Sequence, residues 1–359
     1  MRSEKNSVET KYLKRFAKWT SIILVLSLFL LFSMALASTV GPMPISVGNA
    51  LGIILHQIPI VGNAIKGQWT PVEESVVVQL RLPRVLSAAL VGVALSIAGV
   101  VFQGIFRNPM ADPYVLGVAS GGGFGALLAI VFGVGLSSLG LFYAVPVMAC
   151  IGALSTMFLV YAIARTGFGI PVLRLLLAGI AVSSFFSSLI SLMIATARED
   201  IHAAFNWLFG GFPICKWEYI NVASPAILVC SVAIYAFARD LNVMLLGEEQ
   251  ARYLGVEVEN VKKRLIILGS LITAVAVSIS GIIGFIGLIV PHITRILVGP
   301  DHRILIPSAA LAGASLLVLC DVVARTILRP IVLPTGVITA MLGAPFFIYL
   351  LIKSGRITV

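Results

Sequence analysis

The chain has 359 residues, of which 59% are hydrophobic and only 11% charged, with a mean hydropathy of +1.06 and a net charge of +10. Soluble globular proteins carry about 25% charged residues, so this composition excludes an ordinary soluble enzyme. Apolar runs of about 18 residues or more recur, and each can cross a hydrocarbon core as a helix. The four cysteines, Cys150, Cys215, Cys230 and Cys320, have no metal-ligand spacing and do not indicate a disulfide framework.

The first half of the chain predicts five membrane helices. Residues 1–19 are polar and basic. The apolar run that follows resembles a signal sequence at residues 35–37, but the basic segment is long for a signal, so we expect an uncleaved helix. Residues 41–80 read as a mixed loop whose apolar piece, 51–61, is too short to span. The first five helices are expected over residues 21–38, 85–106, 114–134, 142–164 and 172–195.

The second half predicts five more crossings and two short elements. A short helix is expected over 202–209, before Gly210 and Gly211. Residues 241–255, LNVMLLGEEQARYLG, are amphipathic and predict a pair of short helices on the membrane surface. The remaining membrane helices are expected over 218–237, 264–280, 283–297, 304–325 and 335–352.

Ten crossings place both ends of the chain on one side. Of the 25 Lys and Arg residues, 18 lie on the side of the N-terminus, so the positive-inside rule predicts that both ends and the 239–263 loop are cytoplasmic. The predicted organisation is therefore a cytoplasmic tail (1–19), one ten-helix membrane domain (20–352) and a cytoplasmic tail (353–359). This distribution also explains the net charge without a nucleic-acid partner.

The sequence offers no catalytic or metal-ligating residues. A Gly-Lys dipeptide is absent, which excludes a phosphate-binding P-loop, and the four histidines form no HExxH motif. Asp321 and Arg325 are four residues apart on one helix, where a helix-end ion pair with Arg325 reaching the interface is one reading. No acid or histidine is a strong candidate at mid-membrane, which argues against a proton- or sodium-coupled carrier.

Arg81, Arg84 and Arg325 lie at the predicted outer ends of helices. They could hold acidic residues of a partner, or they could anchor lipid headgroups. In the 241–255 stretch, Glu249, Ala251 and Gly255 have the spacing E-x-A-x-x-x-G. A surface helix that ends in glycine suits a knob that fits a groove, although an ordinary solvated loop has a similar composition.

The ordered set of motifs resembles the membrane subunits of ATP-binding-cassette importers of the FecCD type, the iron-siderophore, haem and cobalamin permease family. The matching residues cover most of 80–352. They are RLPR (81–84), Gly92, Gly99, Gln103, RNPMADP (107–113), LGVASGGGFGA (116–126), LLLAGIAV (175–182), Trp207, Gly210, LGEEQARYLGV (246–256), GFIGLIVPHITR (284–295), DHR (301–303), Pro307, Asp321, Arg325 and LPTGVITAMLGAPFFIYLL (333–351). Val332 departs from the pattern, since the family usually has Glu there.

The resemblance implies an all-α fold of about ten membrane helices like that of cobalamin-importer permeases (type II importers), assembled as a homodimer. Two copies of a separate ATPase would bind ATP and Mg²⁺, no cofactor would bind this chain, and an extracytoplasmic binding protein would deliver substrate to Arg81, Arg84 and Arg325. The path would be lined by the fifth helix and the short helix before Gly210. The resemblance assigns ATPase coupling to Leu246, Gly247, Glu248, Glu249, Ala251, Arg252 and Gly255, and a cytoplasmic gate to Thr166, Gly167 and Phe168.

Family frequency, and no residue of this chain, ranks a ferric siderophore first among substrates, with cobalamin or haem next; some members carry oxyanions such as molybdate. Two other classes stay open. An ion-coupled secondary carrier would transport without an ATPase, and a structural or signalling subunit would transport nothing.

Overall fold

The computed structural model describes residues 2–57, 62, 67–166, 169–197, 201–213 and 215–355. Within these ranges the regular structure is helical, apart from one isolated bridge between Thr166 and Gly169. The elements of the first half are α1 Arg2–Thr39, α2 Val47–His56, α3 Pro71–Ser75, the π-helix η2 Val76–Arg81, α4 Leu82–Phe106, the 3₁₀-helix η3 Pro113–Leu116, α5 Val118–Phe132, α6 Leu136–Ala164 and α7 Val172–Thr196.

The second half contains eight further helices. These are α8 Ile201–Leu208, α9 Trp217–Ala236, α10 Ala238–Met244, α11 Glu248–Tyr253, α12 Val258–Ser280, α13 Ile286–Val298, α14 His302–Thr326 and α15 Thr335–Gly355. Seven helical stretches of the described chain are long and apolar enough to cross a membrane, and α2, α5, α13 and α15 are shorter apolar helices. The predicted fold class, an all-α polytopic membrane protein, is confirmed.

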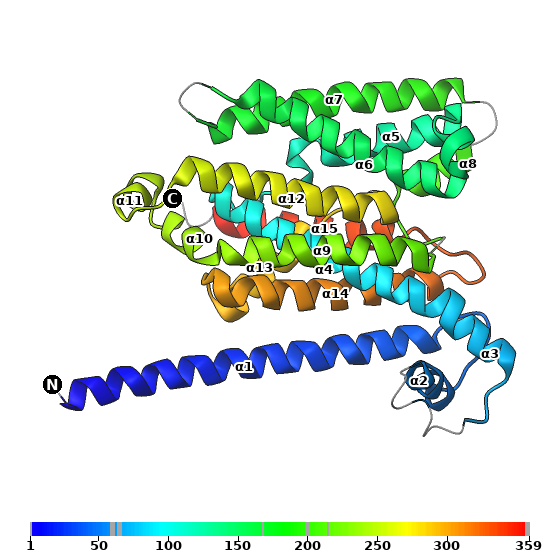
Figure 1. Cartoon of the computed structure of the whole chain (residues 1–359), viewed down its shortest axis with the longest axis horizontal. Helices are drawn as coiled ribbons and strands as arrows, with labels where there is room; N and C mark the ends of the chain where they lie inside the picture. The colour runs from blue at the N-terminus through cyan, green and yellow to red at the C-terminus, as the bar shows by residue number, and fades with distance from the viewer. Residues whose placement is uncertain are drawn as a thin grey trace.

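Helix α4 forms the centre of the bundle, and most of its residues are buried. It packs against α9, α12, α13 and α14, while α5, α6 and α7 form a separate layer and α1 runs along the opposite side (Figure 1). Close packing depends on small residues: a Cβ built on Gly92 would lie 2.3 Å from the carbonyl oxygen of Gly313 on α14. Such contacts replace the hydrophobic effect as the source of association between helices in lipid.

The predicted loop at 41–80 is wrong at two places: residues 47–56 form α2, and the last ten residues, 71–80, are helical. Thr70 and Glu73 form a capping box and Pro71 occupies the first turn, so a helix starts there and runs without interruption through η2 into α4. RLPR (81–84) therefore lies inside this continuous helix, whereas the helix was predicted to begin only after it, at residue 85. Pro83 is tolerated because the preceding turns are π-helical, with the amide of Leu82 bonded to the carbonyl of Val77.

The chain is not helical between α12 and α13, so the eighth membrane helix starts three residues later than predicted. Gly281 and Phe285 have positive φ angles of 67° and 69°. The Tyr114 hydroxyl donates to the carbonyl of Ile283 at 2.9 Å and accepts from the amide of Ile283 at 3.2 Å. Protein groups thus replace the water that irregular backbone would need at membrane depth.

The two marked chain ends and the α10–α11 pair lie at one end of the bundle, whereas α2, α3 and α8 lie at the other (Figure 1). Because both chain ends lie at the same end of the bundle, the arrangement is consistent with an even number of membrane crossings. It places every predicted coupling residue far from the predicted docking arginines.

Candidate functional site

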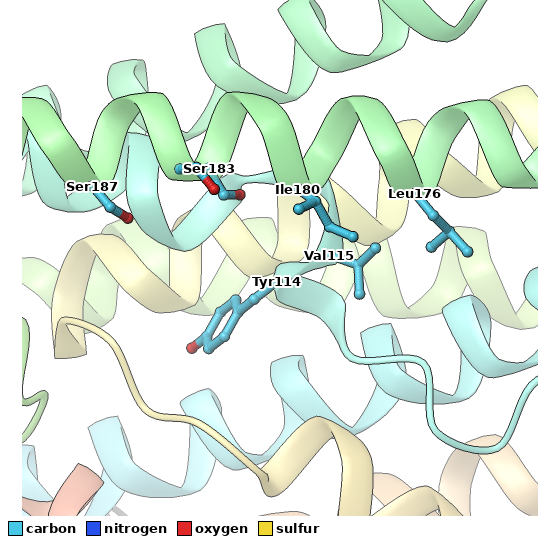
Figure 2. Close-up of a pocket in the computed structure, with 7 residues that line it drawn as sticks. Tyr114, Val115, Leu176, Ile180, Ser183 and Ser187 are labelled. Carbon is cyan, nitrogen blue, oxygen red and sulfur yellow. The ribbon is translucent and has the colours of Figure 1, made fainter.

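A pocket of about 600 Å³ lies between α7 and η3 (Figure 2). The side chains of α7 project toward Tyr114 and Val115 of η3. The α7 residues of the lining are Leu176, Ile180, Ser183, Ser184 and Ser187. The fifth predicted helix, α7, thus borders this pocket, and its role in lining a translocation path stays a prediction.

The geometry of this pocket is fixed by η3. Asp112 caps η3 by accepting the amide of Tyr114 at 2.8 Å, and the Tyr114 hydroxyl is held by Ile283 as described above. Helix α7 approaches η3 closely at Gly179, where a Cβ would lie 1.9 Å from the carbonyl oxygen of Val115. Tyr114 is therefore positioned from two sides and forms a rigid wall opposite α7.

The lining suits passage better than tight binding or chemistry. It combines apolar surface with hydroxyl groups and contains no charged side chain. Hydroxyls can form weak hydrogen bonds to many solutes without the strong retention that a charged pair would impose. Across the described residues, no three His, Cys, Asp or Glu side chains gather as they would around a metal ion.

The α10–α11 pair confirms the predicted two short helices in the 241–255 stretch. Gly247 separates them with φ of 123°, a conformation that L-residues rarely adopt, and Ala251 fastens α11 to the body because it is fully buried. Leu246, Tyr253 and Leu254 are 65%, 83% and 64% exposed. The pair therefore presents an apolar surface outward, which is unusual for a loop in water.

The other predicted coupling residues divide between solvent and the body. Glu249, Arg252 and Gly255 are exposed, and Gly255 has φ of 86°. Glu248 points inward, with its Oε1 2.6 Å from Nζ of Lys262 on α12. Nη2 of Arg252 on α11 lies 3.5 Å from Oε1 of Glu259, which is also on α12. The structure thus joins α11 to the start of α12 by ion pairs.

Thr166 of the predicted gate lies between α6 and α7. Its amide donates to the carbonyl of Gly169 at 2.9 Å, and its hydroxyl donates to the same oxygen. Gly167 and Phe168 lie outside the described residues. The gate therefore stays a prediction.

At the opposite end, Arg81 is 4% exposed and its guanidinium donates to the carbonyls of Ser38, Thr39 and Met43. It satisfies carbonyls that the end of α1 leaves without helical partners. Arg325 donates in the same region, to the carbonyls of Ala37 and Val40.

Asp321 joins the other two predicted docking residues. Its carboxylate accepts hydrogen bonds from Nη2 of Arg84 at 2.9 Å and from the hydroxyl of Thr335 at 3.1 Å, and it forms an ion pair with Nε of Arg325 at 3.0 Å. The ion pair of Asp321 and Arg325 is thus present, and Arg84 extends it to α4. Only 16% of the Arg84 side chain and 10% of the Arg325 side chain are exposed, so the predicted docking role remains a prediction.

Several residues of these sites were missed by sequence reasoning. The serine pairs of α7 (183–184 and 187–188) recur every four residues, a signal for a polar stripe on one helix face. Tyr253 and Leu254 lie inside the 241–255 stretch but were not among the predicted coupling residues. No sequence pattern marked Glu259 and Lys262, because their partners Ile170 and Glu248 belong to other segments.

Comparison with known proteins places these features in a family. The model of the FecCD transport family matches residues 25–353. The cobalamin import system permease protein BtuC of Halobacterium salinarum is 40% identical over 88% of this chain and 91% of its own length. The hemin transport system permease protein HmuU of Yersinia pestis is 41% identical over 76% of this chain and 82% of its own length.

A solved structure resembles the whole fold. It is an inward-facing conformation of a metal-chelate type ABC transporter, with a TM-score of 0.80 and 34% sequence identity, and the match covers 93% of this chain and 99% of the other.

Proposed function

The chain belongs to the FecCD transport family, and we propose that it is the membrane-spanning permease of an ATP-binding-cassette importer that moves a metal chelate across the cell membrane. The cargo that we propose first is a ferric siderophore, with cobalamin or haem next. The pocket on α7 supports a bulky cargo, because its volume of about 600 Å³ is bordered by apolar and hydroxyl side chains without a fixed charge.

The observation that carries the proposal is the exposed α10–α11 pair. Leu246, Tyr253 and Leu254 present large apolar side chains to solvent on an element that Ala251 fastens to the bundle. An aromatic side chain among aliphatic ones is typical of the centre of a protein interface. A partner ATPase, two copies per assembly, would cover this surface and supply ATP and Mg²⁺, neither of which this chain is expected to bind.

The proposed orientation places α10–α11 and both ends of the chain in the cytoplasm. Two arguments support it: the excess of Lys and Arg in the segments predicted on the side of the N-terminus, and the position of both ends beside α10–α11 (Figure 1). The cluster of Arg84, Asp321 and Arg325 would then face outside, where we propose that an extracytoplasmic binding protein docks.

We further propose that the chain works as a homodimer whose path runs between two copies of α7. Large apolar residues, Leu173, Leu177, Ile180 and Phe185, are 68%, 57%, 62% and 61% exposed on this helix. A second copy would cover part of this surface and close the pocket of Figure 2 from the open side.

The test is ATP-driven uptake by the chain reconstituted in liposomes with its ATPase and binding protein. Tyr253→Ala should reduce ATPase association and uptake together, because it removes the most exposed aromatic side chain of α11. Tyr235→Ala on α9 is the matched control, and it should leave association unchanged. Uptake by the chain alone, driven by an ion gradient, would instead establish the secondary carrier.

A further inference from the structure

The carboxylate of Glu259, in the first turn of α12, contacts α11, the segment that enters α7 and a lysine of its own helix. Its Oε2 accepts the amide of Ile170, in the segment that enters α7, at 3.0 Å. Its Oε1 lies 3.5 Å from Nη2 of Arg252 on α11 and 3.6 Å from Nζ of Lys262 on α12. Glu259 is thus placed between the α10–α11 pair and the helix that lines the pocket of Figure 2.

The connection to α11 is reinforced by Lys262. Its side chain is only 3% exposed, and its ammonium lies 2.6 Å from Glu248 and 3.6 Å from Glu259. A buried ammonium that lost either carboxylate would be left with uncompensated charge, so the three groups are held together. Because Glu248 is the first residue of α11, displacement of α11 acts on Lys262 and Glu259 directly.

The connection to α7 is equally tight. Gly169 has φ of 128°, and a Cβ there would lie 2.5 Å from the Glu259 carboxylate, so only glycine permits this approach. Ile170 is followed by Pro171, the N-cap of α7, whose carbonyl accepts the amide of Leu175 at 3.1 Å. The hydrogen bond therefore attaches Glu259 to a residue only two positions before the first residue of α7, so that Glu259 and the helix are closely connected.

A pocket of about 370 Å³ adjoins these contacts. It is lined by Arg107, Thr166, Gly169, Glu248, Glu259 and Lys262 among others. The space beside the ion pairs lets their side chains change position without displacing the core of the bundle, where packing is dense.

We propose that Glu259 is a positioning residue that transmits displacement of α11 to α7, so that a partner acting on α11 changes the pocket between α7 and η3. This inference rests on the proposed function, in which an ATPase binds α10–α11. Energetic coupling between distant sites needs a contiguous set of contacts, and here the set is α11, Glu248, Lys262, Glu259, Ile170 and α7.

The experiment measures backbone hydrogen exchange in the chain reconstituted with its ATPase, without nucleotide and with ATP and vanadate. One peptide covers α11 (248–254), and the other covers the entrance to α7 (169–176). In the natural protein, the ATPase should protect 248–254, and nucleotide should change the exchange of 169–176. ATP-driven uptake and ATP hydrolysis are measured on the same samples.

Glu259→Gln keeps an oxygen for the Ile170 amide but removes the charge that Lys262 and Arg252 contact. We expect protection of 248–254 to persist while the nucleotide response at 169–176 is lost. Uptake should fall about tenfold with hydrolysis within about twofold, since coupling of this kind typically changes a linked equilibrium five- to 150-fold. Glu259→Ala removes both contacts and should reduce the response further.

Glu257→Gln is the matched control. It removes the same charge two residues earlier, where the carboxylate accepts a local hydrogen bond from Asn260 at 2.6 Å, and it should leave the exchange of both peptides and uptake unchanged. A merely structural role of Glu259 would lower hydrolysis and uptake together, which overturns the positioning role.

Two further outcomes separate the inference from its premise. A nucleotide response at 169–176 that persists in Glu259→Gln, with α11 still protected by the ATPase, overturns the inference alone. Absence of ATPase protection at 248–254 in the natural chain contradicts the proposed function, and the inference falls with it. If Glu259→Ala does not fold, the comparison of Glu259→Gln with Glu257→Gln decides.

Discussion

Gly99 and Gly287 meet where α4 crosses α13, and a Cβ built on Gly99 would lie 1.8 Å from the carbonyl oxygen of Gly287. This oxygen belongs to the backbone of α13, so it cannot move aside by rotation of a side chain. We expect Gly99→Ala to force the two helices apart and to lower the free energy of unfolding by about 2 kcal/mol or more, measured by denaturant titration in mixed micelles. Gly284→Ala is the control, because nothing lies within 4 Å of a Cβ there.

Asp321 is 1% exposed and neutralises two arginines from α4 and α14. Asp321→Asn should lower the free energy of unfolding by about 3–5 kcal/mol, since it leaves buried cations without their acid. Arg84→Met should be less severe, because Arg325 still pairs with the acid. Arg264→Met, at an exposed position of α12, should change stability by less than about 1 kcal/mol. Equal losses at Arg84 and Arg264 would show that the cluster does not stabilise the fold.

The same variants separate a structural from a docking role. If Arg84 and Arg325 meet a binding protein, Arg84→Met should weaken that complex by more than its loss of stability explains, measured by binding to the reconstituted importer. An unchanged affinity would assign Arg84 to the fold alone.

Asp301 connects α1 to the start of α14. Its carboxylate lies 2.6 Å from Arg15 and 2.7 Å from Arg303, and it accepts from Asn242 at 2.8 Å. The hydrogen bond from Arg303, followed by that from Asn242, holds the pKa of Asp301 below its ordinary value. The stabilisation is therefore complete above the unfolded-state pKa of about 3.9 and is lost as pH falls through the lower folded-state value.

Asp301→Asn should accordingly lower the free energy of unfolding by a constant amount, about 1 kcal/mol, from pH 8 to pH 5. The difference between the natural protein and the variant should shrink below about pH 4. Stability curves measured at intervals of one pH unit test this, and a difference that grows toward low pH would contradict it.

Ser187 borders the pocket of Figure 2, and Ser188 is the next residue of α7 but not part of the lining. Ser187→Leu fills part of the pocket and should reduce uptake about tenfold with little change in hydrolysis, since a narrowed path blocks cargo and not ATP. Ser188→Leu adds the same volume outside the pocket and should have a much smaller effect on uptake. Equal effects would argue that the pocket is not on the path.

The sequence was sufficient for the helices because long apolar runs have few alternatives in a membrane. The limits of α9 and α14 differ from the predicted ones by one or two residues, whereas α12 begins six residues before its predicted start at residue 264. The second membrane helix was predicted to start at residue 85, whereas Thr70, Pro71 and Glu73 carry a start signal that begins the helix before it. The capping box of Thr70 and Glu73 determines where this helix starts.

The sites were less predictable because they depend on contacts between distant elements. Glu259 and Ile170 are separated by 89 positions, and Arg84 and Asp321 by 237. Spacing along the chain cannot reveal such pairs. The 241–255 stretch could be found because its amphipathic composition is local, whereas the side chains that connect it to α12 and α7 could not.

The shortness of α13 has a consequence for biosynthesis. Its 13 residues cover about 20 Å at 1.5 Å per residue, less than the hydrocarbon thickness of about 30 Å. Its first residue follows irregular backbone whose polar groups need Tyr114, so α13 is poorly suited to enter lipid alone. Tyr114, α4 and α12 all precede α13 in the chain. Translation order therefore delivers α13 only after the surfaces that shelter its exposed end have been made.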